Sequence, residues 1–163
     1  RWYADKDYAK NLENDLAIRK FLDKQLARAS VSRVDIERAG DKIKVTITTA
    51  DDALSKKVEP HVACSSERFA MLDALGSHGI YAGILLMPVL PFLEDSEENV
   101  LAIVRRAHEA GARFIYPAFG MTLRNNQREW YFDKLNEIFP GQNLPEQYIK
   151  RYGNRYECHS PRA

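Results

Sequence analysis

The sequence is poor in cysteine, and it lacks an apolar run long enough to cross a membrane. Its 163 residues include only Cys64 and Cys158, too few and too far apart for the disulfide framework of a small secreted domain. The longest apolar stretch, residues 79–93, is interrupted by Pro88 and Pro91, whereas a membrane-spanning helix needs about 20 apolar residues. The sequence therefore predicts neither a disulfide-stapled nor a membrane-spanning protein.

The sequence also has no excess of charge and no linker, and we expect no secretory leader. The net charge is +1, with 24 basic and 23 acidic residues, so composition alone does not indicate a nucleic-acid partner. No Gly/Ser/Pro-rich stretch separates two complete domains. The opening RWYADKDYAK has no apolar core like that of a secretory signal. We expect a cytoplasmic protein with reduced thiols and no membrane partner.

Helical and strand periodicities are present along the whole chain. Apolar residues three and four apart predict a helix over residues 5–29, and alternation around Gly40 predicts two hairpin strands, at residues 34–36 and 43–47. Beyond residue 50, capping residues predict one helix that begins at Ser65 or Ser66 and another that begins at Asp95 or Ser96. Two further helices are predicted over residues 125–139 and 145–152. Apolar runs predict strands at residues 80–89 and 113–120.

This alternation predicts an α/β fold. We expect one composite domain over residues 1–163 in the order α-β-β-α-β-α-β-α-α, with a mixed four-stranded sheet in which an antiparallel hairpin joins parallel βα units. Open sheet edges and an uncovered apolar face would have to be covered by the first helix or by a second copy. A homodimer is therefore one of the expected states, although no partner is required.

Residues 1 to about 50 carry a specific resemblance. The phrase ASVSRVDIERAGDKIKVTITTA within it closely resembles the start of the type II KH domain of the bacterial small-subunit ribosomal protein S three family. That resemblance implies RNA binding through a Gly-x-x-Gly loop that clamps the nucleic-acid backbone. In the family, this loop comes soon after the strand that corresponds to VTITTA. In this chain, the sequence after that strand departs from the family pattern. GSHG at residues 76–79 has the spacing, but it follows a helix and precedes a strand, which indicates a helix end.

From about residue 46 to 161 the chain looks like a different family. GIYAGILLMPVLPFLEDSEENV, ARFIYPAFGMTLRNNQREWYFDKLNEIFPG and YIKRYGNRYECHSP resemble the C-terminal half-barrel of radical S-adenosylmethionine enzymes related to spore photoproduct lyase. That family holds an iron–sulfur cluster on three closely spaced cysteines, and this chain has no such triplet. Because the cluster needs three thiolates, we expect no radical catalysis and no bound cofactor.

The two resemblances meet between about Ile43 and Ala50, where the sequence of one strand is compatible with both families. We therefore interpret the chain as an artificial recombined chimera, composed of a KH-like segment (1–50) and a half-barrel-like segment (51–163). The leading hypothesis is a folded protein without biochemical activity, made to test foldability or a new fold. One alternative is residual S-adenosylmethionine or weak RNA binding without catalysis. Another is an enzyme half that needs a partner chain, which a cooperative melt of the isolated protein would oppose.

The half-barrel resemblance also implies candidate ligand-binding residues at strand ends. These are Thr48, Thr49, Phe119, Gly120 and Met121. An ordinary structural role for all five is the competing interpretation, because ligand binding needs convergent groups from several elements.

Two other patterns give no site. His61, Cys158 and His159 match no closed zinc spacing, so we expect no metal. Basic residues of the first predicted helix alternate with acidic ones, which is typical of an ion-paired, solvated face. We do not expect RNA binding there beyond nonspecific association at low salt.

Overall fold

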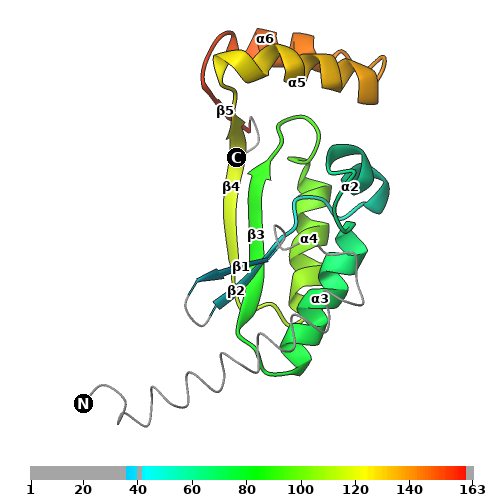
Figure 1. The fold of residues 1–163 in the computed structure, drawn as a ribbon, viewed down its shortest axis with the longest axis vertical. Coiled ribbons are helices and arrows are strands. Elements are labelled where there is room, and N and C mark those ends of the chain that lie inside the picture. The colour runs from blue at the N-terminus through cyan, green and yellow to red at the C-terminus, as the bar shows by residue number, and fades with distance from the viewer. Residues whose placement is uncertain (1–35, 40–41, 161–163) are drawn as a thin grey trace, which may run out of the picture.

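The computed structural model describes residues 36–39 and 42–160, and the helix predicted over residues 5–29 lies outside them. Five strands form one sheet in the order β1-β2-β3-β4-β5 (Figure 1). β2 is antiparallel to β1 and parallel to β3, β4 is parallel to β3, and β5 is antiparallel to β4. The strands are β1 (Ile36–Ala39), β2 (Lys42–Thr46), β3 (Ala82–Val89), β4 (Ile115–Thr122) and β5 (Glu157–His159).

Local signals set the limits of the helices. The Ser96 hydroxyl accepts a hydrogen bond from the backbone N–H of Asn99 and caps one helix, and Gly111 adopts a positive φ of 74° just beyond its end. Gly79, in the GSHG segment, has a φ of 69° one residue after a helix C-cap. The helices are α2 (Asp52–Val58), α3 (Ser65–Ser77), α4 (Glu97–Glu109), α5 (Asn125–Ile138) and α6 (Leu144–Tyr152).

The predicted mixed sheet, with an antiparallel hairpin joined to parallel βα units, is confirmed. Two short elements add to the predicted order. Asp51 caps the seven-residue α2 by accepting from the backbone N–H groups of Ala53 and Leu54, and β5 has three residues, too few to show strand periodicity. The cap of α3 is Cys64, not either serine after it.

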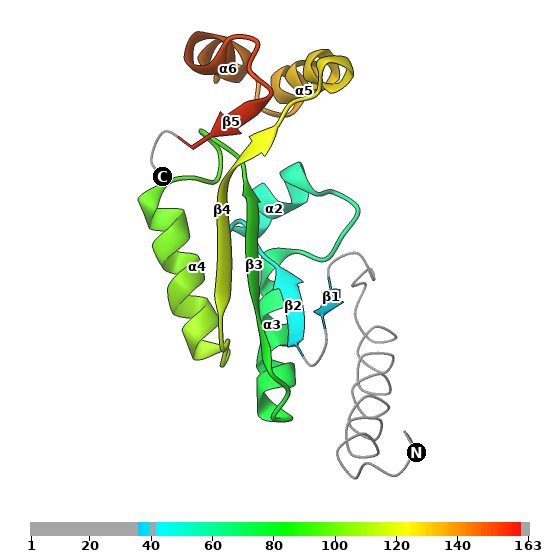
Figure 2. The ribbon, with the colours of Figure 1, turned by 90° about the vertical axis from the view of Figure 1, so that its left-hand side faces the viewer.

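A hydrophobic core joins the sheet to α3 and α4. Alternate residues of the strands face these helices, which lie on one side of the sheet in Figure 1. Figure 2 views the sheet from the opposite side, where none of the described helices covers β3 and β4. The core residues include Ile43, Val45 and Ile47 of the first segment, with Leu72, Ile84, Leu86 and Ile103. Strands from both segments therefore share one core.

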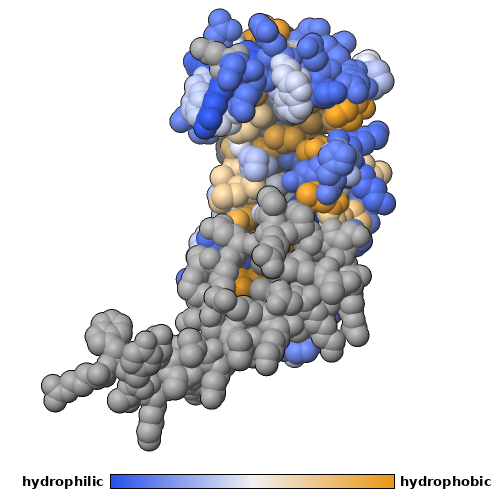
Figure 3. Space-filling model, in the orientation of Figure 1, coloured by the Kyte–Doolittle hydropathy of each residue, from blue (hydrophilic) through white to orange (hydrophobic). Residues whose placement is uncertain are grey.

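A second hydrophobic cluster lies under α5 and α6, at the carboxyl end of β4. Leu123, Leu135, Tyr148 and Cys158 belong to it. In Figure 3 the outer surface of this end is mostly hydrophilic, and hydrophobic atoms gather beneath it toward the sheet. The hydroxyl of Tyr148 donates a hydrogen bond of 2.9 Å to the Pro91 carbonyl, which connects α6 to the loop after β3.

Candidate ligand-binding site

The carboxyl ends of β2, β3 and β4 meet at one edge of the sheet, because these strands are parallel. Open α/β sheets bind ligands at this edge. The five candidate residues all lie near it, at the end of β2 and in the last part of β4. The structure divides them into two groups with different surroundings.

Thr48 and Thr49 are buried, with 7% and 3% of their surface exposed. The Thr48 hydroxyl donates a 2.7 Å hydrogen bond to Oε1 of Glu94, and the Thr49 hydroxyl accepts one of 3.2 Å from the backbone N–H of Asp51. Both hydroxyls therefore have partners within the chain. Their contacts favour a structural role over direct contact with a ligand.

Glu94 is the most deeply buried carboxylate at this edge, with 1% of its surface exposed. Burial raises its pKa to about 7, and hydrogen bonds from the Leu90 backbone N–H and the Thr48 hydroxyl oppose the rise. The sequence reasoning did not single out Glu94. One indication of a special role for Glu94 is present in the sequence, where this acidic residue directly follows an apolar run.

The side-chain amide of Asn99 holds the end of β2 against the loop after β3. Its nitrogen donates to the carbonyl oxygens of Thr48 (2.9 Å) and Glu94 (2.7 Å), while its oxygen accepts from the backbone N–H of Ala50 (2.8 Å). Arg106 also donates to the Ala50 carbonyl, at 2.7 Å. These bonds satisfy backbone groups that the end of β2 would otherwise leave unpaired.

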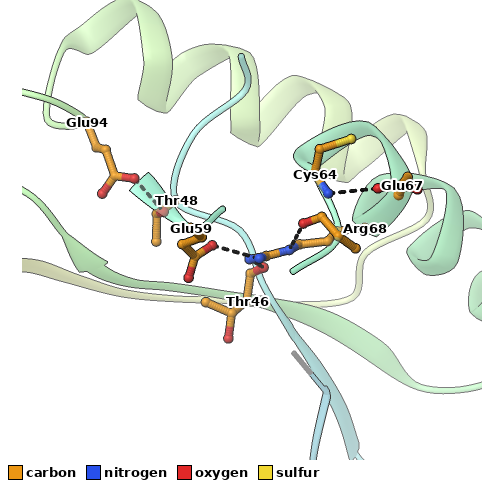
Figure 4. A network of polar contacts seen from close by, with 8 residues as sticks. Thr46, Thr48, Glu59, Cys64, Glu67, Arg68 and Glu94 are labelled. Carbon is orange, nitrogen blue, oxygen red and sulfur yellow. Dashed lines mark hydrogen bonds and ion pairs between the residues drawn. The ribbon is translucent and has the colours of Figure 1, made fainter. Parts of the chain in front are cut away.

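Arg68 of α3 is the buried cation of the same edge, with 2% of its surface exposed. Its guanidinium donates to the carbonyls of Ala63 (2.8 Å) and Thr46 (2.9 Å) and forms an ion pair of 2.7 Å with Glu59. Figure 4 shows this arrangement beside the Thr48–Glu94 pair. The guanidinium is thus engaged by the protein's own groups.

The second group of candidate residues lines a cavity of about 380 Å³ at the end of β4. Phe119, Gly120 and Met121 line it, whereas Thr48 and Thr49 do not. A side chain at Gly120 would not fit, because a Cβ there would lie 2.6 Å from the Cys158 carbonyl oxygen. The remaining lining residues are Ala118, Thr122, Glu157 and His159.

Glu157 and His159 give the cavity its polar groups. They lie two residues apart on β5, with the His159 Nε2 atom 3.2 Å from the Glu157 carboxylate, and both side chains are exposed. The sequence reasoning considered His159 only as a zinc ligand. The pairing of Glu157 with His159 was not predicted, because a strand of three residues is too short to show the alternation that indicates a strand.

The cysteines do not fit an iron–sulfur cluster. Cys64 precedes α3 and Cys158 lies in β5, and both are buried and free. Two thiols cannot supply the three thiolates that the resemblance implies. Within residues 36–39 and 42–160, no group of three His, Cys, Asp or Glu side chains is placed to hold a metal ion.

Comparison with known proteins supports only one of the two resemblances. The chain is 58% identical over 50 residues to the small ribosomal subunit protein uS3 of Streptococcus equi subsp. zooepidemicus, a match covering 31% of this chain and 23% of the relative. The uS3 protein of Marinobacter nauticus is 60% identical over 50 residues, covering 30% and 22%. The chain thus spans less than a quarter of these relatives.

The match covers 50 residues, which is also the length of the segment from Arg1 to Ala50 that carries the KH resemblance. No family model matches the chain, and no solved structure matches it. A segment of about 50 residues is therefore similar to uS3, whereas the half-barrel resemblance has no support from the comparisons. In the part of the chain that the structure describes, no helix is long and apolar enough to cross a membrane.

Proposed function

We propose that the chain is a non-catalytic recombined protein, in which the ribosomal segment continues into an unrelated parallel α/β unit. The observation that carries this proposal is the position of β2. It lies within the first 50 residues, yet it pairs with β1 on one side and with β3 on the other. Ile43 and Val45 of β2 are 0% and 1% exposed in the core shared with the second segment.

The polar groups at the strand ends support the absence of catalysis. Catalysis needs groups that reach a bound substrate, whereas the side chains of Thr48, Glu94 and Asn99 bond to one another or to the backbone. We further propose a reducing, cytoplasmic setting, which is supported by the free thiols of Cys64 and Cys158.

An anaerobic assay tests this proposal. The full chain is incubated with ferrous iron and sulfide, then with S-adenosylmethionine and a strong reductant, and cleavage of S-adenosylmethionine is measured. We expect no cleavage above the protein-free control. Cleavage that disappears in a Cys64→Ser/Cys158→Ser double variant would overturn the proposal, because the thiols would then support the chemistry.

A second candidate function is binding of a small ligand in the cavity at the end of β4. Phe119 and Met121 supply apolar surface there, and the Glu157 carboxylate complements a cation. S-adenosylmethionine carries an adenine and a cationic sulfonium, so it is the first ligand to test. This function is favoured because three of the residues implied by the half-barrel resemblance, Phe119, Gly120 and Met121, line the cavity.

Thermal denaturation with increasing S-adenosylmethionine measures this binding. A ligand that binds only the folded state stabilises it by about 2.7 kcal/mol at a hundred times its Kd. If the cavity binds the ligand, the melting temperature rises with dose, and Glu157→Gln reduces the rise. Glu129→Gln, an exposed carboxylate on α5 that is absent from the cavity lining, is the matched control. An unchanged melting temperature would exclude the cavity as a site for this ligand.

A further inference from the structure

Three aromatic side chains form a row at the amino ends of β3 and β4. Tyr81 directly precedes β3, Phe114 directly precedes β4, and Tyr116 is the second residue of β4. The ring centroids of Tyr81 and Phe114 lie 5.5 Å apart with the planes inclined by 25°, and those of Phe114 and Tyr116 lie 5.0 Å apart at 41°. We call these three residues the aromatic row.

The row lies on the sheet face opposite α3 and α4. Ala82, Ile84 and Ile115 pack in the core with those helices, and neighbouring residues of a strand point to the other face. Gly83 makes room for the row, because a Cβ there would lie 2.6 Å from the Phe114 ring. The rings can therefore lie close over the strands.

The row is open to solvent. Tyr81 is 44% exposed and Tyr116 is 41% exposed. Figure 2 shows that none of the described helices covers this face of β3 and β4. The rings therefore present an accessible aromatic surface.

A cation lies at one end of the row. The Lys42 ammonium lies 6.0 Å from the centre of the Tyr81 ring. Tyr81 also lines a cavity together with Asp73, Glu109 and Arg113. These carboxylates disfavour phosphates in that cavity, so an anionic backbone is favoured on the Lys42 side of the row.

We propose that the aromatic row binds single-stranded nucleic acid, with a base stacked on Tyr116 and the backbone near Lys42. Stacking on aromatic rings tolerates any base, and a neighbouring cation adds electrostatic attraction to phosphate. A single strand fits better than a duplex, because duplex bases are already stacked on each other. All three rings lie beyond residue 50, outside the segment that carries the ribosomal resemblance, whereas Lys42 lies within it.

Fluorescence anisotropy of a labelled oligothymidylate of about 12 nucleotides tests the proposal. We expect the full chain to bind it at about 50 mM salt and to lose affinity steeply toward about 200 mM. Tyr116→Leu keeps the apolar bulk but removes the ring, and it should weaken binding about fivefold or more. Tyr116→Phe keeps the ring and should bind as the unaltered protein does. Lys42→Gln should bind less tightly and with a shallower salt dependence.

Trp130→Leu is the matched control, because Trp130 is 63% exposed on α5, outside the row. It should leave binding unchanged. Equal affinity for Tyr116→Leu and the unaltered protein, or equal affinity for a duplex of the same length, would overturn the proposal. So would sedimentation analysis showing a dimer that Tyr116→Leu dissociates and the oligonucleotide does not, because the row would then be an interface between copies.

Discussion

The hydroxyl of Thr48 donates a 2.7 Å hydrogen bond to the Glu94 carboxylate, and both side chains are buried. This bond joins the end of β2, close to where the KH resemblance ends, to the loop that follows β3. Glu94 also accepts from the backbone N–H of Leu90, at 2.9 Å. The carboxylate therefore links residues 46 positions apart in the sequence.

Stability should fall as pH rises through the titration of Glu94. Its pKa is about 7 in the folded protein, against 4.5 for an ordinary Glu, so the folded state binds the proton more tightly than the unfolded state does. The stabilisation is complete below pH 4.5 and is lost as pH approaches and passes 7. We expect the unfolding free energy, measured by urea denaturation, to be lower at pH 8 than at pH 5 by about 2 to 3 kcal/mol from this group.

Glu94→Gln should remove most of this pH dependence, since the amide does not titrate. Glu98→Gln, an exposed carboxylate in the first turn of α4, should keep it. If Glu94→Gln and the unaltered protein lose equal stability between pH 5 and pH 8, another group is responsible.

Arg68→Met should destabilise the protein by about 3 kcal/mol or more. The substitution keeps the apolar stem, but it leaves the carbonyls of Thr46 and Ala63 without the guanidinium that now donates to them. Glu59→Gln should cost less than about 1 kcal/mol, because the Glu59 side chain is 39% exposed. Comparable losses for both variants in urea denaturation would show that the ion pair matters more than the bonds to the carbonyls.

Gly120→Ala should separate β5 from β4. Its φ is 142°, and a Cβ would lie 2.6 Å from the Cys158 carbonyl oxygen, so we expect a loss of about 2 kcal/mol or more. Gly141→Ala is the control, because it has a φ of 81° but nothing within 4 Å of the Cβ position; strain alone should cost about 1 kcal/mol. Hydrogen exchange should become faster at β5 in the first variant, and unaltered protection there would contradict the prediction.

The sequence predicts the helices and strands better than it predicts the site, because the spacing of apolar residues indicates which face of a helix or strand is buried. The apolar run over residues 80–89 indicated β3 (Ala82–Val89), because the residues of its second face, such as the half-buried Leu85 and Met87, are apolar as well and do not interrupt it. α2 has seven residues and β5 has three, so neither is long enough to show a period.

The site depends on side chains far apart in the sequence, which periodicity does not relate. Thr48 and Glu94 are joined by a hydrogen bond that no spacing rule suggests. Phe119 and Met121 line a cavity only because β5 returns beside β4 and brings Glu157 and His159 there. The aromatic row likewise needs the register that places Tyr116 beside Leu85 on neighbouring strands.

Tyr148→Phe should destabilise both hydrophobic clusters together. The Tyr148 side chain is 0% exposed, and its hydroxyl bonds to the Pro91 carbonyl at 2.9 Å and lies 3.1 Å from the Tyr131 hydroxyl. Its removal leaves the buried Pro91 carbonyl without this donor, which should cost about 1 to 2 kcal/mol. Because Pro91 follows β3 and Tyr148 lies in α6, the loss should weaken the connection between the sheet and the C-terminal helices.

Two probes of urea denaturation distinguish a shared loss from a local one. Far-UV circular dichroism reports the whole chain, and in a Trp2→Phe background the fluorescence of Trp130 reports α5. If the clusters unfold as one unit, Tyr148→Phe lowers both midpoints equally. Tyr156→Phe, with a 50% exposed side chain, should change neither by more than about 0.5 kcal/mol. A lower fluorescence midpoint with unchanged circular dichroism would mean that the helices unfold from the sheet independently, and that the Pro91–Tyr148 bond does not couple them.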